Sequence, residues 1–353
     1  MTTQQINTAL ASFGMSGLVF HGPLLTANSS FHLSAILERT KNEAVKKYPG
    51  VSVFRNYEEL CRDDGIELIV VNTPDHLHYE MARLALEHGK HVVVEKPFTQ
   101  SFAQARGLID LARKNNLILS VFQNRRWDGD FMTVKEVIEK GLLGRLVFFE
   151  SHFDRYRNFI QEGTWKEESS SGSGILFNLG SHMIDQALDL FGTPLSVFAD
   201  LRTMRSGGQV DDSYDIWMEY PDVQVKLCSS YLVREPGPRY ILHGTEGSFL
   251  KWGIDPQEEA LKAGILPKDD AWGEEAQGEW GLLHTSINGK AVRERYKTIP
   301  GNYNIYYNNI YQAIRAGQPL AVTAEQAALV VRVIEACMDS SRLRRVIPIT
   351  LPF

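Results

Sequence analysis

Apolar and polar positions follow two different patterns along the chain. In the first third, short apolar runs alternate with amphipathic stretches, and runs such as Leu68–Val71 and Val92–Val94 are apolar throughout, as strands buried on both faces are. The expected strands are Asn7–Ser12, His32–Leu37, Val51–Phe54, Ile66–Val71, His91–Val94 and Leu117–Phe122. The expected helices between them are Val19–Asn28, Lys41–Tyr48, Tyr57–Asp63, His76–His88 and Phe102–Asn115. This alternation predicts an α/β domain over residues 1–122, with helices on both faces of a parallel sheet.

The pattern changes after residue 122. A helix is expected at Asp130–Lys140, and apolar residues then recur at every second position, as in an antiparallel sheet with one covered face. The alternating runs include Arg145–Arg155, Leu195–Met204, Tyr214–Glu219 and Val223–Tyr231. Two closing helices, Tyr303–Ala316 and Ala324–Arg342, are separated by a Gly-Gln-Pro stop signal. We therefore expect a second, α+β domain over residues 123–353.

Composition narrows the class of protein. The net charge is −6 and the Lys and Arg residues are scattered, so a nucleic-acid partner is not expected. The polar segment Met1–Leu10 lacks the apolar run of a secretion signal, and no segment has the length of apolar residues needed to cross a bilayer. Three cysteines, odd in number and far apart, fit no metal-binding spacing. We expect a cytoplasmic protein with reduced thiols and no membrane association.

A nucleotide-binding turn is expected directly after the first strand. The segment Ser12–Gly17 leads into a helix and carries two of the three glycines of the dinucleotide-binding fingerprint, with Ser12 in place of the first. Such glycines allow the backbone to approach a pyrophosphate, which then lies at a helix N-terminus. The residues of this turn assigned to the cofactor are Phe13, Gly14, Ser16 and Gly17.

The second strand ends where the ribose-recognising group of such a domain belongs, about twenty residues past the glycines. Glu38 would accept hydrogen bonds from both ribose hydroxyls and favour NAD, whereas Arg39 and Thr40 would hold a 2′-phosphate and favour NADP. The sequence leaves both cofactors open.

The fifth strand ends in Glu95-Lys96-Pro97, at the sheet edge where ligands of such domains bind. This triplet resembles the hallmark of the glucose-fructose oxidoreductase and inositol dehydrogenase family, Gfo/Idh/MocA. The resemblance covers essentially the whole chain and is most apparent for the branch that contains scyllo-inositol dehydrogenases. Further stretches that carry it are Asn72–His78, Gln123–Asp128, His152–Arg157 and Gly172–Asp185.

The resemblance implies a Rossmann domain followed by an α+β domain with a large, mainly antiparallel open sheet. The exposed face of that sheet commonly forms the oligomer interface, so a homodimer or homotetramer is expected. The expected cofactor is NAD or NADP. Besides the turn and residues 38–40, its predicted site includes Asn72, Thr73, Pro74, His76, His78, Glu95, Lys96, Pro97 and Asn124.

The predicted catalytic residues are Lys96, His182 and Asp185. In hydride transfer from a secondary alcohol, His182 takes the hydroxyl proton, Lys96 stabilises the developing alkoxide, and Asp185 orients the imidazole. Asn178 departs from the family, in which many members carry an aspartate here; an amide cannot accept the proton but can bind a substrate hydroxyl.

The predicted substrate site consists of Lys96, Arg125, Trp127, Tyr156, Trp165, Asn178 and His182. Arg125 binds an acidic substrate in one interpretation and forms an interdomain ion pair in another. The three aromatic residues either stack on a sugar ring or are buried at the domain junction. His76, His78 and Glu80 directly follow a strand end, where a helix N-terminus near the cofactor is expected, so no metal site is predicted there.

The sequence therefore predicts an NAD(P)-dependent dehydrogenase that acts on a polyol or sugar. Two alternatives on the same fold are a non-catalytic cofactor-sensing regulator and an NAD-dependent glycosidase.

Overall fold

The computed structural model describes residues 4–164, 167–168, 172–267 and 272–350. The chain divides into two compact units, each built from three segments. The first unit comprises Met1–Trp127, Pro256–Trp272 and Asn302–Ala328. The second comprises Asp128–Asp255, Gly273–Gly301 and Leu329–Phe353. Unlike the two domains expected from the sequence, neither unit is contiguous along the chain.

Within the described ranges, the first unit contains a six-stranded parallel sheet with the order β3-β2-β1-β4-β5-β6. The strands are β1 (Ile6–Leu10), β2 (Phe31–Leu37), β3 (Ser52–Phe54), β4 (Leu68–Val71), β5 (His91–Val94) and β6 (Leu119–Val121). The order reverses between β1 and β4, which is the switch point of a Rossmann fold. Every residue of β4 is buried, as its unbroken apolar run predicts.

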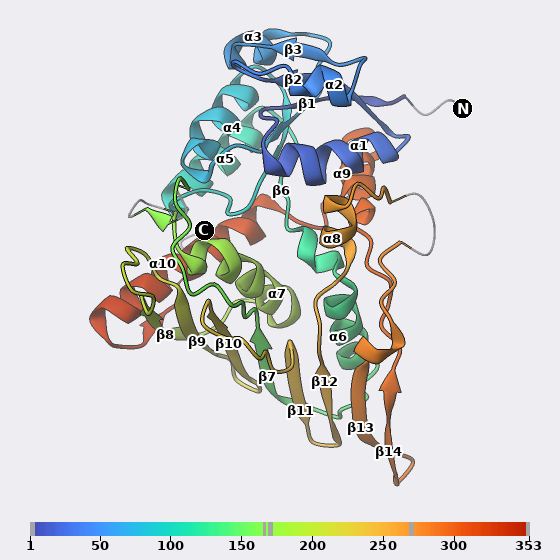
Figure 1. Cartoon of the computed structure of the whole chain (residues 1–353), viewed down its shortest axis with the longest axis vertical. Helices are drawn as coiled ribbons and strands as arrows, with labels where there is room; N and C mark the ends of the chain where they lie inside the picture. The colour runs from blue at the N-terminus through green and yellow to red at the C-terminus, as the bar shows by residue number, and fades with distance from the viewer. Residues whose placement is uncertain (1–3, 165–166, 169–171, 268–271, 351–353) are drawn as a thin grey trace. The chain divides into compact units, whose positions relative to one another are not determined.

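The helices of this unit are α1 (Gly22–Ala27), α2 (Glu43–Lys47), α3 (Tyr57–Arg62), α4 (His78–Glu87), α5 (Phe102–Lys114), α8 (Gln257–Lys262) and α9 (Asn304–Ala316). Figure 1 shows α4 and α5 on one side of the strands and α1 and α9 on the other. The two-sided covering confirms the predicted α/β class.

Helix α9 joins this unit because of its aromatic residues. Tyr306 and Tyr307 are buried. Tyr306 packs edge-on against Phe122 and Tyr307 packs edge-on against His21, and both partners lie near the carboxyl edge of the sheet. The sequence places α9 some two hundred residues after the sheet, so its position depends on these long-range contacts and not on local pattern.

The second unit contains, among its described residues, a nine-stranded sheet with the order β14-β13-β12-β11-β7-β10-β9-β8-β15. Its strands are β7 (Leu146–His152), β8 (Ser196–Arg202), β9 (Ser213–Glu219), β10 (Gln224–Ser230), β11 (Tyr240–Gly244), β12 (Gly247–Lys251), β13 (Gly281–Ile287), β14 (Lys290–Tyr296) and β15 (Ile347–Pro348). All neighbouring pairs are antiparallel except β7 and β10. The predicted mainly antiparallel sheet is therefore confirmed.

One face of this sheet forms the core of the second unit. It packs against α6 (Gly129–Glu139), α7 (Ser181–Phe191) and the second-unit part of α10 (Ala324–Leu343), as Figure 1 shows for α7 and α10. Because side chains alternate along a strand, Phe149, Ile216 and Leu227 point into the core. Their neighbours in sequence occupy the opposite, open face.

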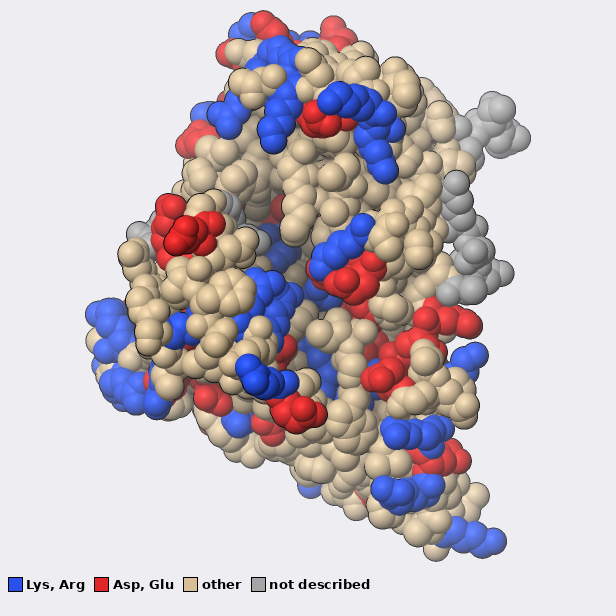
Figure 2. Space-filling view, viewed as in Figure 1, with Lys and Arg blue, Asp and Glu red and all other residues tan. Residues whose placement is uncertain are grey.

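On the face of the molecule drawn in Figure 2, acidic and basic side chains are interspersed and form no basic stripe. No helix within the described residues combines the length and the apolar character needed to span a bilayer.

Candidate active site

The turns that follow β1, β4 and β5 carry most of the predicted cofactor residues. These strands are neighbours in the parallel sheet, so their carboxyl ends meet at one edge. The structure therefore brings together the glycine turn, the Asn72-Thr73-Pro74 segment and the Glu95-Lys96-Pro97 triplet.

Ser12 fits the glycine turn despite replacing the first fingerprint glycine. Its Oγ accepts a hydrogen bond from the Gly14 amide at 3.2 Å, so the side chain supports the turn from within. Asn72 ties the turn to β4, because its Nδ2 donates to the Ser12 carbonyl at 2.9 Å and its own carbonyl accepts from Ser16 Oγ at 3.2 Å. At Gly17 a Cβ would lie 2.6 Å from the Ser12 carbonyl oxygen, so this close approach requires glycine.

The helix after this turn begins differently from the expectation. The segment Gly17–His21 is a π-helix that continues into α1, whereas an α-helix over Val19–Asn28 was predicted. A π-turn is seldom encoded by local sequence, and such turns occur frequently at functional sites.

In the predicted ribose-recognition segment after β2, Glu38 differs in its surroundings from Arg39 and Thr40. Glu38 is buried, and its carboxylate accepts hydrogen bonds from the Glu43 and Ala44 amides at 3.2 and 3.0 Å. These amides open α2, so Glu38 satisfies the free donors at the start of that helix. Arg39 and Thr40 are exposed.

A buried chain of hydrogen bonds fixes the Glu95 carboxylate. Tyr307 Oη lies 2.7 Å from His21 Nδ1, and His21 Nε2 lies 3.0 Å from Glu95 Oε1. The second carboxylate oxygen of Glu95 accepts from the Lys96 amide at 3.0 Å. Burial by itself would raise the pKa of Glu95, but His21 and Lys96 outweigh it and lower that pKa, so the carboxylate is ionised.

His78 joins two turns of the predicted site. Its Nδ1 lies 2.9 Å from the Pro97 carbonyl oxygen and its Nε2 lies 2.9 Å from the Thr73 carbonyl oxygen. Both ring nitrogens are thus engaged by the backbone, which makes His78 a support of the site. His76 is exposed, and Glu80 pairs with Arg83 on the surface of α4.

Lys96 is partly buried and stands two residues past the end of β5. The Lys96–Pro97 peptide bond is cis. Asn124 is buried in the 3₁₀ turn after β6, at the same edge of the sheet.

The second unit carries the other predicted catalytic residues on α7. His182 and Asp185 are buried and stand three residues apart, so they share one face of the helix. Asn178 lies in a second π-helix, Leu176–Gly180, which leads into α7, and its Nδ2 is 3.3 Å from Tyr231 Oη.

Asp211 anchors the start of that π-helix. Its Oδ2 accepts from the Leu176 amide at 2.8 Å, and its backbone carbonyl accepts from the Ile175 amide at 2.9 Å. Gly174 has a φ of +92° and lies so close that a Cβ there would be 2.2 Å from Asp211 Oδ1. Burial raises the pKa of Asp211 to about 6.

Two predicted substrate residues have structural partners within the first unit. Arg125 pairs with Glu258 at 2.5 Å, and both side chains are largely buried. Both residues belong to the first unit, so this ion pair is not the interdomain pair of the alternative interpretation. Burial alone would raise the pKa of Glu258, but the charges of Arg125 and Lys262 lower it to about 2. Trp127 is buried beside Tyr306, with ring centroids 5.7 Å apart, as a packed aromatic residue would be.

Of the remaining aromatic candidates, the structure describes Tyr156, in the second unit. Tyr156 is exposed, and the Arg234 guanidinium lies 4.2 Å from its ring centre, so its accessible ring can stack on a ligand. Trp165 lies outside the described residues.

His21, Tyr307 and Asp211 were not predicted from the sequence. His21 and Tyr307 are 286 positions apart, and neither lies in a motif. The pair Asp211-Asp212 before an alternating strand was the available signal for this anchor, but a pair of aspartates more often marks an exposed turn.

Comparison with known proteins places this geometry in a family. The model for the oxidoreductase family Gfo/Idh/MocA, NAD-binding Rossmann fold, matches residues 6–123, and the model for its C-terminal alpha/beta domain matches residues 135–351. The scyllo-inositol 2-dehydrogenase (NADP(+)) IolW of Bacillus subtilis is 39% identical over 342 residues, which cover 97% of this chain and 95% of that protein.

Two crystal structures share the fold over nearly the whole chain. A Bacteroides fragilis protein assigned to the oxidoreductases is 50% identical, with a TM-score of 0.91 and coverage of 98% of this chain and 100% of that one. The Bacillus subtilis protein yvaA, assigned to the same class, is 38% identical, with a TM-score of 0.95 and coverage of 99% and 100%.

Proposed function

This chain belongs to the Gfo/Idh/MocA family of NAD(P)-dependent oxidoreductases, and we propose that it transfers hydride between the nicotinamide and a secondary alcohol of an inositol-like polyol or sugar. The observation that carries the proposal is the position of Lys96. This cation follows β5 at the sheet edge that also bears the glycine turn, so a dinucleotide bound by the turn would have an ammonium group at the same edge.

The residues fit a dinucleotide. Gly14 is exposed within the glycine turn, and a turn of this type binds a pyrophosphate through its amides. Phe13, Gly14 and Ser16 complete the turn, and Thr73, Pro74, His76 and Asn124 come from neighbouring strand ends. When bound, NAD(P) supplies the nicotinamide ring that accepts or donates hydride.

In the proposed mechanism, Lys96 donates a hydrogen bond to the substrate oxygen and stabilises its developing negative charge, which contributes about 3 kcal/mol. His182 accepts the hydroxyl proton, and Asp185, one helical turn away, orients its imidazole. Glu95 has a positioning role: it holds the Lys96 amide and is itself fixed by His21. Asn178 binds a substrate hydroxyl and Tyr156 packs against the substrate.

We further propose that the preferred cofactor is NADP. Glu38 would have to release the two amides of α2 in order to bind ribose hydroxyls, whereas the exposed Arg39 and Thr40 are accessible to a 2′-phosphate. The relative IolW bears the name of an NADP(+) enzyme, which agrees with this assignment.

The test is absorbance at the reduced-nicotinamide band, with NAD or NADP and a panel of inositols, aldoses and sugar acids. A rise with one polyol supports the dehydrogenase. Release of free sugar without net cofactor reduction would instead support an NAD-dependent glycosidase. Cofactor binding by calorimetry without any turnover would support the regulator and refute the enzyme.

A further inference from the structure

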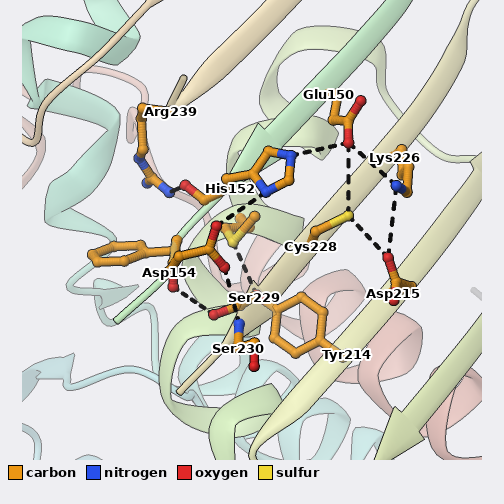
Figure 3. A network of polar contacts seen from close by, with 12 residues as sticks. Glu150, His152, Asp154, Tyr214, Asp215, Lys226, Cys228, Ser229, Ser230 and Arg239 are labelled. Atoms are coloured by element: carbon orange, nitrogen blue, oxygen red, sulfur yellow. Dashed lines mark hydrogen bonds and ion pairs between the residues drawn. The ribbon is translucent and has the colours of Figure 1, made fainter. Parts of the chain in front are cut away.

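A second cluster of reactive side chains lies on the open face of the nine-stranded sheet. Glu150 and His152 stand two residues apart on β7 and therefore point to the same face. Cys228 on β10 is paired with His152 across the parallel ladder, and Asp215 on β9 is paired with Cys228 across the antiparallel one. Figure 3 shows the four side chains converging from three adjacent strands.

The donor atoms are close enough to bind one ion. Glu150 Oε1 lies 2.9 Å from His152 Nε2 and 3.9 Å from Cys228 Sγ, and these three atoms all lie within 4.8 Å of one another. Asp215 Oδ1 lies 3.1 Å from the same sulfur. Ligands of a tetrahedral zinc ion, with bonds of about 2.0–2.3 Å, lie about 3–4 Å apart, a spacing that the donors of Glu150, His152 and Cys228 already approach. Asp215 lies beside the sulfur and would rotate toward the ion to become the fourth ligand.

The surroundings of His152 match the outer shell of a metal site. His152 Nδ1 lies 3.2 Å from Asp154 Oδ2, and the other oxygen of Asp154 accepts from the Ser230 amide at 3.0 Å. Metal-binding histidines commonly donate their second ring N–H to a carboxylate, which fixes the ring and leaves the other nitrogen for the metal. Asp154 lies outside the three donors, in the position of such an outer partner (Figure 3).

Binding must overcome the charges already present. The Lys226 ammonium lies 3.2 Å from Glu150 Oε1 and 3.7 Å from Asp215 Oδ1, where it offsets their charge. It also lies 5.3 Å from the Trp217 ring centre, and because the side chain is partly exposed it can move aside. Burial raises the pKa of Cys228, and so does Asp215, so the thiol is protonated until a metal displaces the proton.

We propose that Glu150, His152, Cys228 and Asp215 form a zinc site on this sheet. On binding, the Cys228 S–H bond is replaced by an S–Zn bond and the proton passes to solvent, with no change of oxidation state. Four protein ligands close the coordination sphere, so the site is structural and cross-links β7, β10 and β9. None of these residues takes part in the hydride transfer proposed above.

The test uses the full chain after treatment with a chelator. Zinc is titrated in competition with a chromogenic indicator, and cobalt is titrated separately to detect a thiolate-to-cobalt charge-transfer band. We expect one tight zinc per chain and a band that is lost in Cys228→Ser but retained in Cys337→Ser, which alters a cysteine in the core.

The histidines provide a matched pair of variants. His152→Gln should abolish tight binding, whereas His243→Gln, which changes an exposed histidine on β11, should leave it unchanged. Asp154→Asn should weaken binding about 10–100-fold without removing a direct ligand. Circular dichroism confirms that each variant is folded.

Failure of the wild-type chain to bind zinc, or equal binding by wild type and Cys228→Ser, would overturn the proposal. If a variant does not fold, the cobalt spectrum of the wild type and of Cys337→Ser still decides whether a thiolate is a ligand.

Discussion

The partly buried carboxyl of Asp211 offers a test of how the segment before His182 is held. Its pKa lies at about 6, against an ordinary 3.8, because burial disfavours the charged form more than the Leu176 amide stabilises it. The folded protein therefore binds this proton more tightly than the unfolded chain does. The stabilisation is complete below the unfolded pKa and is lost as pH rises through about 6.

The size of the effect follows from the two pKa values. A difference between 3.8 and about 6 corresponds to about 3 kcal/mol of unfolding free energy, lost between about pH 4 and pH 7. Asn at this position has no proton to lose, and its carbonyl oxygen can still accept from the Leu176 amide. We therefore expect Asp211→Asn to match wild type near pH 4 and to exceed its stability by up to about 3 kcal/mol near pH 8.

Urea unfolding at a series of pH values measures this difference. Asp110→Asn, at an exposed position of α5, is the control and should show no comparable pH-dependent gain. A difference between wild type and Asp211→Asn that does not vary with pH would refute the reasoning, as would a variant that is less stable than wild type near pH 8.

Three further predictions concern the candidate site. Lys96→Ala should lower kcat at least a hundred-fold, about 3 kcal/mol, while calorimetry shows cofactor binding retained; unchanged turnover would remove Lys96 from the mechanism. Arg39→Ala should raise KM for NADP about 10–100-fold, which corresponds to about 1.5–3 kcal/mol, and leave KM for NAD nearly unchanged. A parallel rise of KM for both cofactors would contradict a contact between Arg39 and the 2′-phosphate. Tyr307→Phe removes the hydroxyl next to buried His21 Nδ1 and should lower the unfolding free energy by about 1–3 kcal/mol. Tyr311→Phe, whose ring is less buried, is the control and should change that free energy by under about 0.5 kcal/mol. Equal effects of the two substitutions in urea titrations would argue against the hydrogen-bond chain that supports Glu95.

The local pattern was sufficient for the elements of the first sheet. All six predicted strands overlap observed ones, because a strand buried on both faces must be apolar at nearly every position. The later part of the chain was harder. Strands β11 to β14 and helix α8 were not individually predicted, and β14 is largely exposed, so burial imposes little pattern on its residues.

The catalytic candidates were accessible to sequence because they follow recognisable strand ends and motifs. Lys96 follows an apolar strand, and the glycine turn follows another, so a parallel sheet places both at one edge by its topology. The residues that hold these side chains in place could not be predicted from the sequence. The chain from Tyr307 through His21 to Glu95 joins three distant segments, and no local pattern records such a contact.

The sequence by itself thus determined the family, the parallel and antiparallel sheets, and the residue types available for hydride transfer, because these depend on periodicity and short motifs. Only the tertiary structure decided that Glu38 binds the amides of α2 and that Arg125 pairs with Glu258. It also decided that Glu150, His152, Cys228 and Asp215 converge on one face. The physical reason is that a buried polar group must find a partner, and the fold, rather than the neighbouring sequence, determines which partner is within reach.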